Sequence, residues 1–175
     1  MPSYYTYLIA GLPMLHFTAK PPFTFERFIE ICRGLIPPGE LEMLSSASIK
    51  GDYQGVSLSP TLEKWRNFDT ALRNELVKIR AVRRKQEPLG YLRQTHYIEA
   101  GLAHLAAAAF RNPSTLEAER MLDEERWGFL EELSAGHYFD LDFLIAYAHK
   151  LLILQRWEKV RASDKPKVLA EAIGG

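Results

Sequence analysis

The feature that most constrains this chain is a series of long segments in which apolar residues recur at helical spacing. Four such segments cover about residues 60–85, 91–110, 114–134 and 141–161. Steps of three and four residues are typical of an amphipathic α-helix, and no alternating pair around a tight turn predicts a β-hairpin. The sequence therefore predicts an all-α fold: a helical bundle of four long helices plus short helices, with no substantial β-sheet.

Capping and breaking residues mark the expected ends of these helices. Ser59 precedes a proline at the first helical position, and the stretch STLE at 114–117 matches a capping box. Asp140 is placed to cap the last long helix, while Gly136 is placed to end the helix before it. Pro88-Leu89-Gly90 predicts a break between the first two long helices.

The remaining residues predict shorter elements. These are helices at 24–36, 40–47 and 166–174, a proline-rich loop at 13–23 and a flexible loop at 49–58. Residues 1–23 are expected to dock on the bundle as a short helix or an extended arm ended by Pro13. The tyrosine rings of this segment are expected to be buried, with their hydroxyls bonded to polar partners. At 175 residues, the chain predicts a single helical domain, 1–175.

Composition excludes several classes of protein. Lys and Arg number 22, as do Asp and Glu, so the chain as a whole lacks the basic field of a nucleic-acid-binding protein. The most apolar windows are too short and too charged for a transmembrane helix. No Lys or Arg precedes the first apolar run, which argues against a secretory signal. We therefore expect a cytoplasmic protein.

Motifs for catalysis or cofactor binding are absent from the sequence. There is no P-loop, no G-x-S-x-G, no G-x-G-x-x-G and no H-E-x-x-H. The histidines, at 16, 96, 104, 137 and 149, are expected to be scattered and partly exposed. Cys32 falls on the apolar face of a predicted helix, where cysteine usually packs as a small hydrophobe. We expect no catalytic, cofactor or metal site, although an enzyme whose site is not visible in the sequence remains an alternative.

Charge is distributed unevenly along the chain. Residues 73–93 contain seven basic and two acidic residues, and residues 114–134 contain seven acidic and two basic ones. These poles are solvated faces, or attract each other within the bundle, or form a charged surface for a partner. The basic candidates for partner contact are Arg80, Arg83, Arg84 and Lys85. Because no aromatic residue interleaves with them, nucleic-acid binding is not expected.

Two charged residues interrupt apolar stripes. Asp69 lies between Trp65 and Leu72 at helical spacing, and Arg126 lies among Leu122, Phe129 and Leu130. Charged side chains on apolar faces are rare unless they are paired. We therefore predict that Asp69 and Arg126 each have a buried or interfacial partner, and each is a candidate partner for the other.

The last long helix is apolar on nearly all sides. A thin polar stripe of Asp142, His149 and Arg156 is flanked by large apolar residues that include Trp157. A helix of this kind is either central in its own fold or covered by another molecule. Both interpretations remain open at this point.

Three stretches of the chain together resemble a small bacterial family encoded beside V-type ATPase genes. They are YYTYLIAGLPML near the start, ERWGFLEEL at 125–133 and HYFDLDFLIAYAHKLLILQRW at 137–157. That family is similar to the funnel subunit of V/A-type ATPases, which is designated C, or d in eukaryotes. The resemblance implies an all-α, non-catalytic subunit. The candidate packing residues that it indicates are Tyr5, Tyr7, Tyr147, Lys150 and Arg156.

The resemblance also implies a role and partners. The funnel subunit consists of helical bundles and couples the central rotor stalk to the membrane-embedded proteolipid ring. This chain is shorter, so it either supplies part of such a funnel or uses the fold differently. We expect an accessory component, or one similar to the funnel subunit, with rotor-stalk and ring subunits as partners, peripheral to the inner face of the plasma membrane through them. The alternative is a stand-alone helical adaptor or regulator.

Overall fold

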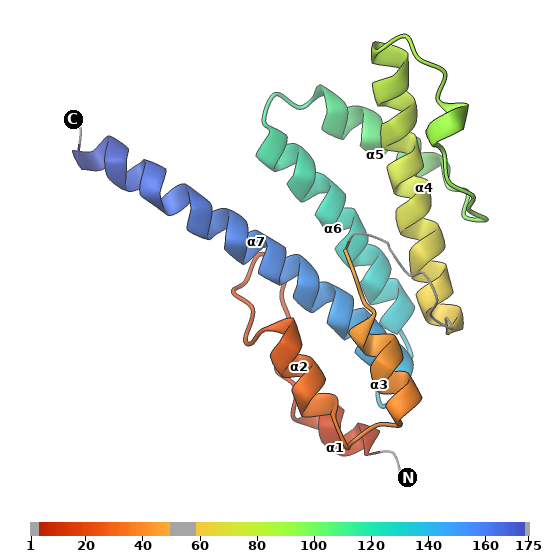
Figure 1. The fold of residues 1–175 in the computed structure, drawn as a ribbon, viewed down its shortest axis with the longest axis vertical. Helices are drawn as coiled ribbons and strands as arrows, with labels where there is room; N and C mark the ends of the chain where they lie inside the picture. The colour runs from red at the N-terminus through yellow and green to blue at the C-terminus, as the bar shows by residue number, and fades with distance from the viewer. Residues whose placement is uncertain (1–3, 50–58, 174–175) are drawn as a thin grey trace. The chain divides into compact units, whose positions relative to one another are not determined.

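The computed structural model describes residues 4–49 and 59–173, with backbone alone for 164–173 (Figure 1). Its elements in order are α1 (Tyr5–Ala10), α2 (Phe25–Cys32), α3 (Pro38–Ser45), α4 (Pro60–Arg83), the 3₁₀ turn η1 (Leu89–Tyr91), α5 (Ala100–Arg111), α6 (Thr115–Ser134) and α7 (Leu141–Ile173). No strand occurs within these described ranges, so the all-α prediction is confirmed. The arrangement as a four-helix bundle stays a prediction. The loop predicted at 49–58 lies, beyond Ile49, outside the described residues.

The helices begin where local hydrogen bonding predicts. The N-cap side chains each accept a hydrogen bond from the backbone N–H three residues later, at Thr24, Ser59, Ser114 and Asp140. Such a bond satisfies one of the backbone donors that a helix start leaves without a partner. Gly136 follows α6 with a φ of 83°, in the left-handed conformation that glycine adopts without steric cost.

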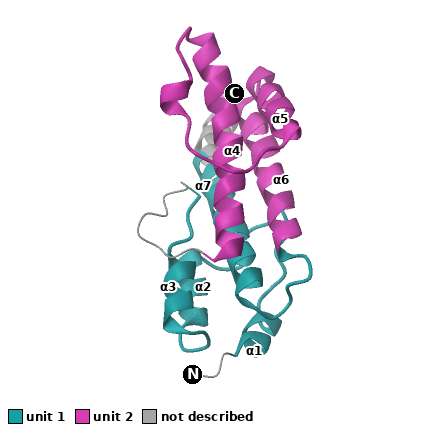
Figure 2. Cartoon of the chain, turned by 90° about the vertical axis from the view of Figure 1, so that its right-hand side faces the viewer, with its two compact units in different colours: residues 1–56, 134–175 teal, residues 57–133 magenta. Residues whose placement is uncertain are grey.

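The chain divides into two compact units (Figure 2). Unit 1 contains residues 1–56 and 134–175, and unit 2 contains residues 57–133. Unit 1 thus combines the two ends of the chain, while unit 2 is continuous in sequence. The single helical domain expected for residues 1–175 stays a prediction.

In unit 1, the helices α2 and α3 pack against α7 and against each other. The segment between α1 and α2, together with the first residue of α2, is tied to α7 by hydrogen bonds to main-chain atoms. The Tyr147 hydroxyl donates to the carbonyl of Pro13 at 3.0 Å, and the Gln155 side chain accepts from the N–H of Phe25 at 2.9 Å. Arg161 donates to the carbonyl of Thr18 at 2.7 Å. The N-terminal segment therefore docks on α7 of its own chain.

The first helix corrects one expectation about the N-terminal tyrosines. The segment does form a short helix, but Tyr4 is 51% exposed and Tyr7 is 76% exposed. A helix of six residues can bury only one face, and Leu8 and Ile9 occupy that face. Tyr5 is half-buried, and its hydroxyl is buried without a hydrogen-bond partner among the described residues.

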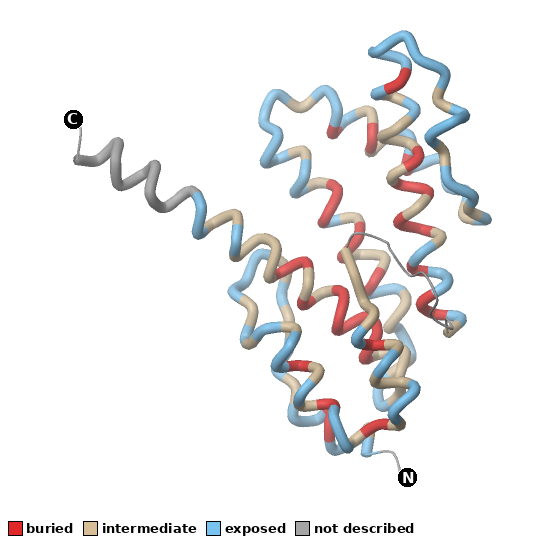
Figure 3. Tube along the Cα trace, viewed as in Figure 1, coloured by how far each residue is buried: buried red, intermediate tan, exposed pale blue. Residues whose placement is uncertain are grey.

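The central turns of α7 are buried on nearly all sides (Figure 3). All residues from Leu144 to His149 are buried, as are Leu151, Ile153 and Leu154. This confirms the interpretation of this stretch as a central helix. The expectation that the histidines are partly exposed is wrong for His149, which is only 1% exposed, with Nδ1 2.8 Å from the carbonyl oxygen of Ile145.

In unit 2, α5 packs against α4. The core between α4 and α6 is aromatic: the rings of Phe68 and Phe129 stack with centroids 4.0 Å apart, and Tyr97 packs edge-on against both. Edge-on contacts such as those of Tyr97 are favoured by the quadrupoles of the rings. Trp65 adds a tilted contact to each phenylalanine, so one aromatic cluster joins the two helices.

A buried charge cluster lies beside these rings. Arg126 donates through Nε to Asp69 at 2.8 Å and through a terminal nitrogen to Asp123 at 2.9 Å, and Arg73 donates to the second oxygen of Asp69 at 2.6 Å. The predicted pairing of Asp69 with Arg126 is confirmed. Burial alone lowers the pKa of Arg126, but the carboxylates of Asp69 and Asp123 outweigh it and raise that pKa above its ordinary value.

Several predicted helix boundaries are wrong. The helix predicted at 40–47 lies two residues earlier, at Pro38–Ser45, because proline fits the first position of a helix. The helix predicted at 91–110 begins only at Ala100, because Arg93 accepts a hydrogen bond from Asn74 of α4 and Thr95 donates one to the carbonyl of Asn67 of α4. The helix predicted at 24–36 ends at Cys32, before Gly34, which has a φ of 80°. The separate helix predicted from Pro166 is part of α7, since a proline weakens a helix without always ending it.

Candidate functional site

The C-terminal end of α4 turns the chain back on itself. Lys85 has a φ of 55°, and the N–H of Gln86 donates to the carbonyl of Ala81 at 3.0 Å. A left-handed residue followed by this six-to-one bond is a Schellman motif, which closes the free carbonyls at a helix end. The motif reverses the chain immediately after its most basic stretch.

The returning segment is fixed against α4 by Asn74. The buried side chain of Asn74 donates to the carbonyl of Arg93 at 2.7 Å and accepts from the N–H of the same residue at 3.0 Å. An amide that bonds both main-chain groups of one residue imitates a paired strand and favours an extended backbone. The turn η1, which ends at Tyr91, is thereby held beside the last turns of α4.

A groove of about 320 Å³ lies where η1 meets α4. Its lining residues are Val77, Arg80, Ala81, Arg84, Gln86 and Tyr91. The α4 members are spaced at three and four residues, which places them on one face of the helix. Ala81 is buried and Val77 half-buried, whereas Arg80, Arg84 and Tyr91 are exposed. The groove therefore has an apolar depth and a cationic, aromatic rim, and we call it the α4 groove.

The cations of this helix end differ in their partners. Lys78 is bonded to Glu75 at 2.6 Å, and the Arg83 guanidinium lies 5.6 Å from the centroid of the Phe110 ring. Within the described ranges, no carboxylate pairs with Arg80, Arg84 or Lys85. The partial negative charge at a helix C-terminus favours cations there, but it amounts to only about half a charge. The rim of the α4 groove therefore carries an excess of positive charge.

Apolar side chains are exposed at the same end of α4. Val82 is 74% exposed, Leu89 73% and Tyr91 63%. The sequence places no aromatic residue among the arginines, but the fold brings Tyr91 to them from η1. This end of unit 2 thus combines cations with exposed apolar surface, a combination common at protein interfaces.

A second pocket, of about 230 Å³, lies in unit 1 between α7 and the segment that follows α1. Its lining includes residues 12–15 together with Phe143, Ala146, Tyr147 and Lys150. Burial raises the pKa of Tyr147, whose hydroxyl is already engaged with Pro13. Two predicted packing residues, Tyr147 and Lys150, therefore meet at the place where the N-terminal segment docks.

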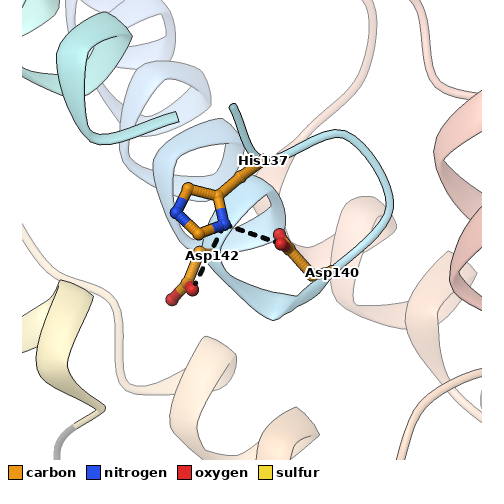
Figure 4. A group of neighbouring side chains, drawn as sticks. All are labelled: His137, Asp140 and Asp142. Atoms are coloured by element: carbon orange, nitrogen blue, oxygen red, sulfur yellow. Dashed lines mark hydrogen bonds and ion pairs between the residues drawn. The ribbon is translucent and has the colours of Figure 1, made fainter. Parts of the chain in front are cut away.

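A histidine and two aspartates lie together at the start of α7 (Figure 4). His137 Nδ1 is 2.6 Å from Asp140 and 3.5 Å from Asp142, and all three donor groups lie within 4.8 Å of one another. The spacing would suit a small cation. However, Asp140 also caps the helix by accepting from Phe143, and the positive end of a helix disfavours a cation. Asp140 thus acts as the N-cap of α7.

The other predicted residues lie apart from the α4 groove. Arg126 is buried in the charge cluster, and Tyr5 and Tyr7 lie on α1. Arg156 and Trp157 are neighbours on α7, with the guanidinium 5.9 Å from the indole centroid. Burial raises the pKa of Cys32 to about 12, which fits the prediction of a buried apolar cysteine. The structure thus joins Arg80 with Arg84 and Tyr147 with Lys150.

Sequence patterns miss two residues of the α4 groove region. They place Tyr91 in a helix, and they give no role to Asn74, which holds the returning segment. A signal for Tyr91 is present in Pro88-Leu89-Gly90, since this break predicts a tight turn next to it. No local signal identifies Asn74, because its partner lies 19 residues away.

Comparisons with known proteins give no relative for this chain. No protein-family model, no curated protein and no solved structure matches it. None of the helices within the described ranges is both long and apolar enough to cross a membrane.

Proposed function

We propose that this protein is a non-catalytic helical interaction protein that serves in a V-type ATPase, as an accessory component or one similar to the funnel subunit. In this role it links the central rotor stalk to the membrane ring through packed helices and complementary charge. The observation that carries the proposal is the exposed surface at the end of α4. There, cations without a carboxylate partner among the described residues adjoin exposed apolar side chains. A partner that covers the apolar part of this surface and pairs its charges forms a complex of lower free energy than the separate proteins.

The resemblance supports the choice of partner. Two of its three stretches belong to unit 1, where the N-terminal segment and α7 contact each other through Tyr147 and Pro13. These two stretches therefore lie in one packed substructure. The ATPase partner rests on this resemblance, whereas the interaction role rests on the α4 surface.

Affinity purification from native membranes tests this function. The full chain carries a C-terminal tag, and the co-purifying proteins are quantified by mass spectrometry. We expect rotor-stalk and proteolipid-ring subunits to be enriched over an untagged control. A stable partner set without any ATPase subunit would contradict the ATPase role and favour the second candidate, a stand-alone helical adaptor that uses the same surface.

A further inference from the structure

The α4 groove has the dimensions and chemistry to seat one side chain of a partner. Val77 and Ala81 provide the apolar depth, and a volume of about 320 Å³ accommodates a leucine-sized or aromatic group. Tyr91 forms an exposed edge that can cover such a group with apolar area at little entropic cost. An apolar anchor residue therefore fits the interior of the groove.

The cationic rim of the groove favours a partner with negative charge. Arg80 lies in the last turn of α4 and Arg84 is its C-cap residue, and both line the same groove. Each guanidinium presents a planar set of donors that matches a carboxylate in two parallel hydrogen bonds. An anchor that enters the groove thus has a cation on either side, each without a carboxylate partner in the described parts of the chain.

From these features we propose that the α4 groove binds an acidic amphipathic segment of a partner protein. One apolar side chain of that segment sits against Val77 and Ala81, and neighbouring Asp or Glu carboxylates pair with Arg80 and Arg84. This inference rests on the proposed role as an interaction protein, and it adds the chemistry of the partner.

Two other classes of partner fit the groove less well. A nucleic acid is drawn by an extended basic field, but this chain carries no net charge and α6 is strongly acidic. An anionic membrane is bound by clusters of several cations with inserted apolar groups. The cations here converge on a groove with a buried floor, which suits a single inserted side chain better than a flat lipid surface.

Fluorescence anisotropy with synthetic peptides tests the inference on the full-length protein. The probe is a labelled helical peptide of about 14 residues, with leucines at helical spacing and glutamates between them. One comparison peptide has serine in place of every leucine, and a second has lysine in place of every glutamate. We expect the peptide with both leucines and glutamates to bind and the two comparison peptides not to bind. The affinity of the bound peptide should fall as the salt concentration is raised.

Matched variants locate the binding. We expect the affinity for the probe to fall by about tenfold or more in two variants, Arg80→Gln/Arg84→Gln and Tyr91→Ser. The control is Lys64→Gln/Arg66→Gln, which removes two exposed cations from the other end of the same helix and should leave binding unchanged. Circular dichroism and thermal melting establish that each variant is folded, as expected for exposed positions.

Several results would overturn the inference. These are failure of the wild-type protein to bind the acidic amphipathic probe, equal binding of the serine peptide, or unchanged binding by the Arg80/Arg84 variant. Tighter, Arg80- and Arg84-dependent binding of a uridine oligonucleotide or of phosphatidylserine–phosphatidylcholine vesicles would also overturn it. The membrane purification distinguishes the two proposals: if the Arg80/Arg84 variant recovers the ATPase subunits as wild type does, the groove inference fails while the function stands.

Discussion

Arg126 neutralises two carboxylates that are almost completely removed from water. Asp69 is 5% exposed and Asp123 is 0% exposed, and both accept hydrogen bonds from the same guanidinium. Arg126→Met leaves both carboxylates without their shared cation, so we expect unfolding free energy to fall by about 3–5 kcal/mol. Urea denaturation followed by circular dichroism measures the change.

Two further variants of the charge cluster complete this test, one that replaces Arg126 with lysine and one that replaces all three charged residues with apolar ones. Arg126→Lys keeps the charge but cannot bridge both carboxylates through a planar fork, so a smaller loss is expected. The triple variant Asp69→Leu/Asp123→Leu/Arg126→Met removes all three charges and should recover much of the stability lost by Arg126→Met. A loss below about 1 kcal/mol for Arg126→Met would show that the cluster is not needed for folding.

We expect Glu125 to make the stability of unit 2 depend on pH. Burial raises the pKa of Glu125, and the carboxylates of Glu99 and Glu132 raise it further. The folded state therefore holds this proton more tightly than the unfolded chain, and stability falls as the pH rises from the ordinary glutamate pKa through the raised one. Glu125→Gln should add about 0.5 kcal/mol at neutral pH, a size typical of exposed charge pairs.

The pH dependence of that gain is the diagnostic result. In acid, below the ordinary glutamate pKa, Glu125 is protonated in both states, so the advantage of Glu125→Gln should vanish. Thermal melts across this range measure it, with Glu42→Gln, an exposed position on α3, as the control. A gain that persists unchanged into acid would assign the effect to something other than charge.

Lys85 adopts a backbone conformation that suits glycine. Its φ of 55° ends α4, and a side chain in this region costs about 1 kcal/mol relative to glycine. Lys85→Gly should therefore raise the melting temperature modestly, whereas Lys85→Ala, which removes the same charge but keeps a Cβ, should not. Gly136→Ala, at a φ of 83°, should have the opposite effect. Equal results for Lys85→Gly and Lys85→Ala would contradict this account.

At the scale of elements, α1 anchors the N-terminal segment by its two buried residues. Leu8 is 3% exposed, whereas Tyr7 is 76% exposed. Leu8→Ala is expected to cost about 2–4 kcal/mol of stability through lost contacts and a cavity, and Tyr7→Ala less than about 0.5 kcal/mol. Denaturation curves of both variants provide the comparison. If the two changes cost the same, α1 does not dock as the structure places it.

The elements also show what sequence patterns can and cannot predict. Helix starts at Ser59, Ser114 and Asp140 were predictable because a cap bonds a backbone group three residues away. The paired charges of the core were predictable because each interrupts an apolar stripe. The extended residues before Ala100 were not, because the side chain of Asn74 decides their conformation from α4. The α4 groove depends on the same contact, so the sequence indicated its arginines but not its shape.

At the scale of the whole molecule, the two units carry different parts of the account. Unit 1 joins the N-terminal segment to α7 and contains most of the residues on which the proposed ATPase role rests. Unit 2 carries the α4 groove, with its cationic rim and apolar depth. The proposed function needs both units. Unit 1 carries the residues that suggest a V-type ATPase as the assembly, and unit 2 provides the surface for contact.

The central claim is that this protein acts by binding an ATPase partner through the end of α4. The most direct measurement is a binding titration by biolayer interferometry. The purified V-type rotor-stalk and ring subcomplex is immobilised, and the full-length protein is added at increasing concentration. We predict saturable binding that Arg80→Gln/Arg84→Gln weakens by about tenfold and that Lys64→Gln/Arg66→Gln leaves unchanged. Absence of binding by the wild-type protein, or equal weakening by both double variants, would contradict the account.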